Sequence, residues 1–89
     1  MTEEDKPTRL TRALNPMPPD IRDLLENRRL SDAYHARPPY QRNDYLGWIG
    51  RAKRPETRTK RIMQMLDELD RGTVYMNMPY KARNARKTN

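Results

Sequence analysis

Hydrophobic positions along this chain recur at helical spacing, beginning with a stripe near residue 20. After a pair of prolines come Ile21, Leu24 and Leu25. The two leucines lie three and four residues beyond Ile21, which is the spacing of one face of a helix. Proline is tolerated in the first turn of a helix because its missing N–H leaves no donor unpaired there. These signals predict a first helix over about residues 19–28.

Two further helices are predicted between this stripe and residue 52. Ser31-Asp32 is a plausible cap for a short second helix, which Pro38 must stop because the residue before a proline avoids helical conformation. Pro38-Pro39 also starts the third helix. Its inward stripe consists of Tyr45, Trp48, Ile49 and Ala52.

The fourth helix has signals at both ends. Pro55 breaks the preceding helix and occupies the first position of the next, which runs to about Asp70-Arg71 and stops at Gly72. The inward positions of this helix are Ile62, Met65, Leu66 and Leu69. Beyond it, residues 74–80 are expected to lie extended across the bundle as a single segment without a strand partner.

These elements predict an all-α fold, a small bundle of about four helices with an extended C-terminal segment and a flexible basic tail. Residues 1–17 read as a flexible leader, 18–80 as the helical domain and 81–89 as a disordered basic tail. With 34% hydrophobic residues and no Phe, the chain can bury only a small core. The predicted core is Leu24, Leu25, Tyr34, Tyr45, Trp48, Ile49, Ile62, Leu66 and Leu69, with the segment 74–80 over it.

Two features of the third helix have alternative interpretations. Trp48 shares the inward stripe, so a core position is favoured over a stacking platform for a base or a sugar. Gly47 and Gly50 each lower helix propensity, which indicates the close approach of a neighbouring group unless they are merely tolerated.

The composition offers little to catalysis or to metal binding. The chain has no Cys and a single His, His35, so a closed zinc site and a disulfide framework are excluded. Capping explains Ser31 and Asp32 better than a catalytic triad with His35 does. Three acidic residues lie near the end of the fourth helix: Asp67, Glu68 and Asp70. We interpret them as a solvated surface that pairs with Arg71. We therefore expect no enzyme activity, no cofactor and no metal, and no small-molecule substrate is evident.

Positive charge is concentrated around Pro55. The chain carries a net charge of +7, and residues 51–61 hold six basic side chains and one acidic one. Cations before a helix N-terminus suit an anion, so we identify a set of candidate anion- or partner-binding residues. They are Arg51, Lys53, Arg54, Lys60 and Arg61. The alternative is a solvated charged surface in which Arg58 pairs with a local acid such as Asp44.

The N-terminus lacks the apolar run that a secretory signal or a membrane span requires. We therefore expect a cytoplasmic location without membrane insertion.

Residues 18–72 resemble the YdeI/OmpD-associated family of small bacterial proteins, also called bacteriocin-protection or OmdA-like. The pattern that carries the resemblance is Asp44-Tyr45-x-x-Trp48-Ile49-x-x-Ala52-Lys53-x-x-x-Thr57-Arg58-x-x-Arg61-Ile62. A looser upstream pattern consists of Pro19-Asp20-Ile21, Leu24, Leu30, Ala33-Tyr34 and Pro38-Pro39. The resemblance implies an all-helical bacterial domain, often joined to a separate N-terminal domain, and it supplies no catalytic residues. Only a short polar leader precedes the domain here, and no export signal accompanies the link to the envelope in the family name.

Two functions fit these observations. The first is a noncatalytic module that binds a protein partner through apolar surface, and homo-oligomerisation is compatible with it. The second is electrostatic binding of RNA or DNA through the 51–61 patch and the basic tail. The short Arg54-Pro55 junction does not match the longer turn of a DNA-reading helix-turn-helix.

Overall fold

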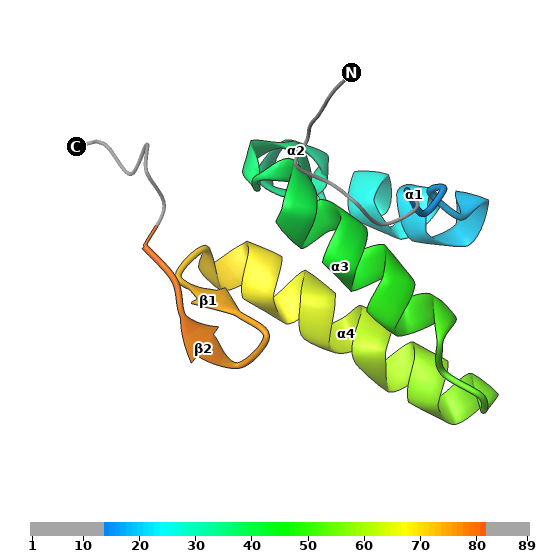
Figure 1. Cartoon of the computed structure of the whole chain (residues 1–89). Helices are drawn as coiled ribbons and strands as arrows, with labels where there is room; N and C mark the ends of the chain where they lie inside the picture. Colours follow the sequence, from blue (N-terminus) through cyan, green and yellow to red (C-terminus); the bar gives the residue numbers. More distant parts are fainter. Residues whose placement is uncertain (1–13, 82–89) are drawn as a thin grey trace, which may run out of the picture.

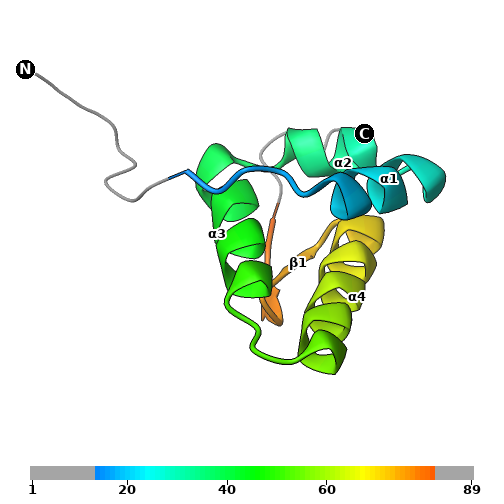
Figure 2. The same cartoon turned by 90° about the vertical axis from the view of Figure 1, so that its right-hand side faces the viewer.

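The computed structural model describes residues 14–81, which form four helices and one small hairpin. The helices are α1 (Pro19–Asn27), α2 (Ser31–Ala36), α3 (Pro39–Gly50) and α4 (Pro55–Arg71). In Figure 1, α3 and α4 run alongside one another, with the hairpin beyond the end of α4. Figure 2 shows that α3 and α4 diverge from their short connection, and that α1 and α2 lie across the open end.

The predicted helix boundaries are confirmed where proline and glycine set them. Pro19, Pro39 and Pro55 each occupy the first turn of a helix. Gly72 ends α4 in the left-handed conformation, with φ 78°, and its N–H donates to the Glu68 carbonyl at 2.9 Å. The predicted cap of α2 is wrong, because Ser31 is already its first helical residue and no side chain caps this helix.

The C-terminal segment overturns the predicted all-α fold class. Strands β1 (Val74–Tyr75) and β2 (Met78–Pro79) pair as an antiparallel hairpin, with Tyr75 opposite Met78. The chain is therefore mainly helical with a small two-stranded sheet. The expectation of a single extended segment is wrong because the chain reverses at Met76 and Asn77, whose φ angles are 50° and 64°. Positive φ at both central residues is typical of a tight two-residue hairpin turn.

One core joins the four helices. Most of the predicted core residues are buried, whereas Leu24 and Trp48 are half-buried and pack against it. The buried apolar residues are Ile21, Leu25, Leu30, Tyr34, Tyr45, Leu46, Ile49, Ile62, Met65, Leu66 and Leu69. Met65 is fully buried, as expected for methionine in a core without Phe.

Residues 14–17 cross α3 before the chain enters α1, as Figure 2 shows. The Asn15 N–H donates to Asn43 Oδ1 at 2.7 Å, and the Asn15 side-chain amide donates to the Asn43 carbonyl at 3.2 Å. Met17 packs against the core. Most of the predicted leader (residues 1–13) and of the predicted tail (82–89) lies outside the described residues.

The close approach predicted for glycine in α3 is found at one of the two positions. A Cβ atom at Gly47 would lie 2.9 Å from Asn15 Nδ2 and 3.2 Å from an Arg51 guanidinium nitrogen. A Cβ atom at Gly50 would have no neighbour within 4 Å, so that glycine is not required by packing. Gly47 therefore allows the segment before α1 to lie directly on α3.

Candidate functional site

The Glu68 carboxylate is buried where α3, α4 and the hairpin meet, and only 2% of the residue is exposed. Its Oε1 atom accepts hydrogen bonds from the Tyr45 hydroxyl at 2.5 Å and from the Met76 N–H at 2.7 Å. Its Oε2 atom accepts from the Gln64 amide at 3.0 Å and from the Asn77 N–H at 2.9 Å. The prediction that Glu68 belongs to a solvated acidic surface is wrong.

The environment keeps Glu68 ionised and Tyr45 protonated. Burial alone would raise the pKa of Glu68, but hydrogen bonds from Tyr45, the Asn77 and Met76 N–H groups and Gln64 together lower it. Burial raises the pKa of Tyr45, and the neighbouring Glu68 raises that pKa further. The proton of this pair therefore stays on the tyrosine oxygen. The pair fixes the turn of the hairpin.

Arg37 makes a second buried connection to the hairpin, with 5% of the residue exposed. Its Nη2 atom donates to the Glu68 carbonyl at 3.0 Å and to the Val74 carbonyl at 2.9 Å. Its Nη1 atom donates to Gln41 Oε1 at 3.1 Å, and its guanidinium carbon lies 4.7 Å from the centre of the Tyr80 ring. Arg37 thus joins the end of α2 to α3, α4 and both sides of the hairpin.

Neither Glu68 nor Arg37 was identified as a functional residue from the sequence. Both use their polar atoms to join elements of the fold. Among residues 14–81, no group of three or more His, Cys, Asp or Glu side chains is arranged to hold a metal ion.

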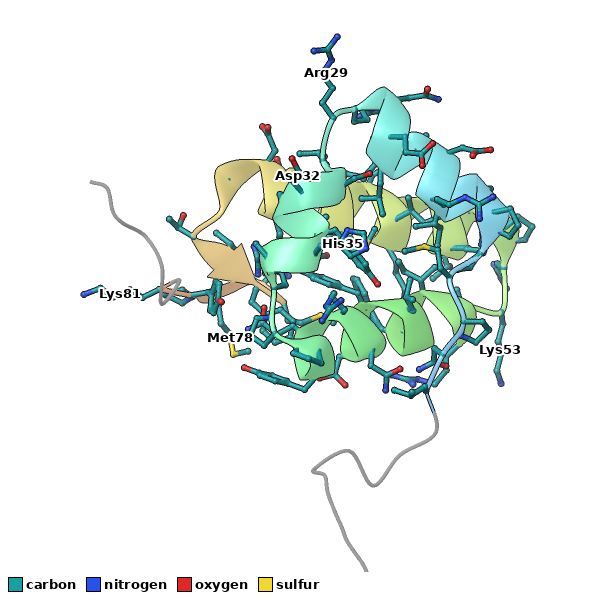
Figure 3. The ribbon with its side chains drawn as sticks, turned by 90° about the horizontal axis from the view of Figure 1, so that it is seen from above. Arg29, Asp32, His35, Lys53, Met78 and Lys81 are labelled. Carbon is teal, nitrogen blue, oxygen red and sulfur yellow. The ribbon has the colours of Figure 1, made fainter. Side chains whose placement is uncertain are left out.

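The five predicted anion- or partner-binding residues do not share one environment. Arg51, Lys53 and Arg54 are exposed at the connection between α3 and α4, and Lys60 is exposed farther along α4. Figure 3 shows Lys53 projecting from this end of the molecule. These cations are accessible from solvent, and their role in binding stays a prediction.

Arg61 and Arg58 have structural partners. The Arg61 guanidinium donates to the Trp48 carbonyl at 2.7 Å and lies over the Trp48 ring, 5.3 Å from its centre. Arg58 forms a two-pronged ion pair with Asp20, with distances of 2.8 and 3.2 Å. The expectation that Arg58 pairs with an acid is confirmed, but the partner is Asp20 of α1 and not Asp44, which was given as an example.

A hollow of about 570 Å³ lies between the segment before α1 and helices α1, α2 and α3. We call it the N-terminal groove. Apolar side chains form its floor, and three of them are also buried members of the core. These floor residues are Met17, Leu25, Tyr34 and Leu46. The floor is thus a place where the core reaches the surface, and it needs four separate elements to form.

The rim of the N-terminal groove is polar and exposed. Arg22 and Glu26 come from α1, whereas Asp32 and His35 come from α2. Figure 3 shows Asp32 and His35 on α2 from above, while Arg29 points away from the body of the molecule. The sequence pattern gave no sign of this arrangement, because the residues are neither adjacent nor on one helix.

His35 and Tyr34 are fixed against each other beside this groove. Their rings meet edge to face with centres 5.3 Å apart. His35 Nδ1 lies 2.8 Å from the Ser31 carbonyl, which can only accept, so the proton sits on Nδ1. In the neutral ring, Nε2 is then an acceptor. Burial raises the pKa of Tyr34, and the charge of Arg42 opposes that rise.

A second, smaller hollow of about 370 Å³ lies between the α1–α2 connection and α4. Its apolar residues are Leu30, Leu66 and Met63, and Met63 has 43% of its surface exposed. Asp67, also in its wall, is engaged in an ion pair with Arg71 at 3.1 Å. This hollow has fewer apolar lining residues than the N-terminal groove. The negative charge of Asp67 in its wall is already neutralised by Arg71.

Comparison with known proteins identifies one family. Residues 16–72 match the model of a family described as Bacteriocin-protection, YdeI or OmpD-Associated. No curated protein and no solved structure gives a significant match to the chain. Along the described part of the chain, none of the helices is both long enough and apolar enough to span a lipid bilayer.

Proposed function

We propose that this chain, which belongs to the family of bacteriocin-protection, YdeI- or OmpD-associated proteins, is a noncatalytic module that binds another protein. The observation that carries the proposal is the N-terminal groove, an apolar floor of about 570 Å³ surrounded by exposed polar side chains. Protein interfaces commonly have such an apolar centre and a polar rim.

The way the groove is held together supports this proposal. Tyr34 and Leu46 are fixed by the core, and the segment that carries Met17 is tied to α3 through Asn15 and Asn43. A preformed floor lowers the cost of binding because few side chains must be ordered when a partner arrives. The chemistry described above also favours binding over catalysis, since the buried charged groups Glu68 and Arg37 are engaged in the fold.

Affinity capture from a lysate of the native cells tests the proposal. The bait is the full chain, compared with Glu26→Lys/Asp32→Lys, which reverses two rim charges. The control is Asp23→Lys/Glu56→Lys, which changes the net charge equally at exposed positions that do not line the groove. A specific protein retained by wild type and control, lost with the rim variant and resistant to nuclease, is the expected result. Equal capture by all three baits would contradict a role for the groove.

A second candidate function is electrostatic binding of RNA or DNA. It is favoured by the exposure of Arg51, Lys53, Arg54 and Lys60, whereas Arg58 and Arg61 are half-buried and engaged with Asp20 and Trp48. Anisotropy titration of labelled RNA and DNA across salt concentrations tests it. Affinity should fall by about one log unit per log unit of salt for each phosphate contacted. If the anisotropy of both labelled nucleic acids stays unchanged at low salt, this function is excluded.

A further inference from the structure

We propose that the N-terminal groove takes a peptide segment in which an aliphatic side chain is flanked by Lys or Arg. This inference rests on the proposed protein-binding function and names the chemistry of the partner. It depends on the sign of the charge at the rim, the hydrogen-bonding atoms there and the size of the apolar floor.

The charge around the groove is opposite in sign to that of the chain. Residues 19–36, which form α1, α2 and their connection, hold four acidic and three basic side chains, and one of the acids, Asp20, is paired with Arg58 of α4. At the rim, Glu26 and Asp32 stand against the single arginine Arg22. A basic segment is therefore attracted locally, although the molecule as a whole attracts anions.

Three of the four rim side chains, Glu26, Asp32 and His35, present hydrogen-bond acceptors, whereas Arg22 presents donors. Glu26 and Asp32 offer carboxylate oxygens, and the Nδ1 contact of His35 with Ser31 leaves Nε2 as an acceptor in the neutral ring. Lysine and arginine side chains carry only donors, so they match this rim. An acidic segment would place acceptors against acceptors and like charges against each other.

The floor has room for a bulky apolar side chain. Leu25, Tyr34 and Leu46 are 1%, 4% and 7% exposed, so the core holds them in place and only a small part of each faces the groove. Met17 completes the floor with a flexible, polarisable side chain that adapts to ligands of different shape. An aliphatic side chain seated there would remove apolar surface from water on both partners.

Charge elsewhere on the molecule favours this site for such a partner. The exposed cations Arg51, Lys53 and Arg54 lie at the α3–α4 connection, so a basic segment is repelled from that end. Specific recognition often combines attraction at one surface with repulsion at others. The acidic rim is thus a surface on which a basic partner has both an apolar contact and a favourable charge.

Selection of peptides from an unbiased library tests the inference. A phage-displayed library of random 12-residue peptides is selected against the immobilised full chain. A chain of +7 would by itself enrich acidic peptides, so the expected enrichment of Lys or Arg beside Leu, Ile or Met is not the default outcome. Amide resonances of the rim residues should shift when a selected peptide is added to the labelled protein.

Variants in which two carboxylates are replaced by amides distinguish the effect of the rim from that of the net charge. Binding of the selected peptides to Glu26→Gln/Asp32→Asn should weaken about 2- to 30-fold, as expected for the loss of two partly exposed charge pairs. The control Asp23→Asn/Glu56→Gln has the same net charge and should bind within about twofold of wild type.

The outcomes distinguish this inference from the proposed function. Acidic peptides, peptides bound equally by both variants, an empty selection, or a small molecule that alone shifts the groove resonances would each overturn the inference. If a nuclease-resistant protein is still captured through the groove, the proposed function stands and only the chemistry of its partner is wrong. If the capture also fails, both are overturned.

Discussion

Glu68→Gln removes the negative charge at which four donors meet while keeping the size of the side chain. In the native protein, Tyr45 and Met76 donate to one carboxylate oxygen, and Gln64 and Asn77 donate to the other. Glutamine places an NH₂ group against one of these pairs. The tyrosine hydroxyl or the glutamine amide can turn to accept from it, but a backbone N–H cannot.

The substitution therefore leaves one backbone N–H of the hairpin turn facing a donor inside the protein. A buried donor without an acceptor costs about 1–3 kcal/mol, and a hydrogen bond to a charged group contributes about 1.5–3 kcal/mol. We expect the free energy of unfolding of Glu68→Gln to fall by about 2–4 kcal/mol. That is a large part of the ~3–10 kcal/mol expected for a domain of this size.

Urea unfolding followed by far-ultraviolet circular dichroism measures this loss, and hydrogen exchange of the Met76 and Asn77 amides localises it. Asp67→Asn is the matched control, because it removes the same charge from an exposed neighbour on α4 and should cost no more than about 0.5 kcal/mol. A stability of Glu68→Gln within about 0.5 kcal/mol of wild type, with both turn amides still protected, would refute the proposed role of the carboxylate.

Three further predictions concern acidity, glycine and the surface ion pair. The pKa of Glu68 is lowered in the folded state, so the stabilisation by its carboxylate is present above about pH 4.3 and is lost as the pH falls through the folded pKa. Denaturation measured across pH should therefore show the difference in stability between wild type and Glu68→Gln closing in acid. Gly50→Ala should raise the unfolding free energy by up to about 1 kcal/mol through helix propensity. Gly47→Ala should raise it less, because the new Cβ atom displaces the segment before α1. A larger rise in unfolding free energy at Gly47 than at Gly50 would contradict the close approach. Arg58→Ala should cost no more than about 1 kcal/mol, decreasing with salt, because the pair with Asp20 is partly solvated; a larger loss in thermal unfolding would mean that the pair is shielded.

The helices were predictable because their boundaries depend on local backbone chemistry. Proline fixes where α1, α3 and α4 begin, and Gly72 adopts the left-handed conformation that ends α4. The apolar stripes then identified most of the buried faces. These signals act within a few residues, so they are readable without knowledge of the tertiary structure.

The hairpin was not predictable from its turn residues. Two-residue hairpin turns favour Asn-Gly or a similar pair because both residues take positive φ. Here the pair is Met76-Asn77, and a methionine at positive φ is disfavoured by its side chain. The turn is held instead by the distant Glu68 carboxylate, which accepts a hydrogen bond from each of its N–H groups.

Glu68 itself was misread because charged residues are expected in water. It lies three residues beyond Met65 and so on the flank of the buried stripe of α4, but only the hairpin supplies the donors that allow its burial. Arg37 is similar, since the carbonyls of Glu68 and Val74 that it binds are distant in sequence. A charged residue on the flank of an apolar stripe is the one signal that could have indicated Glu68.

One part of the candidate site could be identified from the sequence and the other could not. The cations around Arg54 form a run in the sequence and were identified there, and their role in binding remains a prediction. The N-terminal groove combines side chains from the segment before α1 and from three helices. No periodicity links Glu26, Asp32 and Leu46, because their proximity depends on the packing of α1 and α2 across α3.

Photo-crosslinking in the native cells tests the central claim that the groove binds a protein. A photoreactive amino acid is placed in the full chain at Glu26 on the groove rim or, in a parallel variant, at Lys53 on the α3–α4 connection. We predict a discrete protein adduct from position 26 that survives nuclease and is absent from position 53. Adducts formed only at position 53 and removed by nuclease would contradict the account and favour binding of nucleic acid.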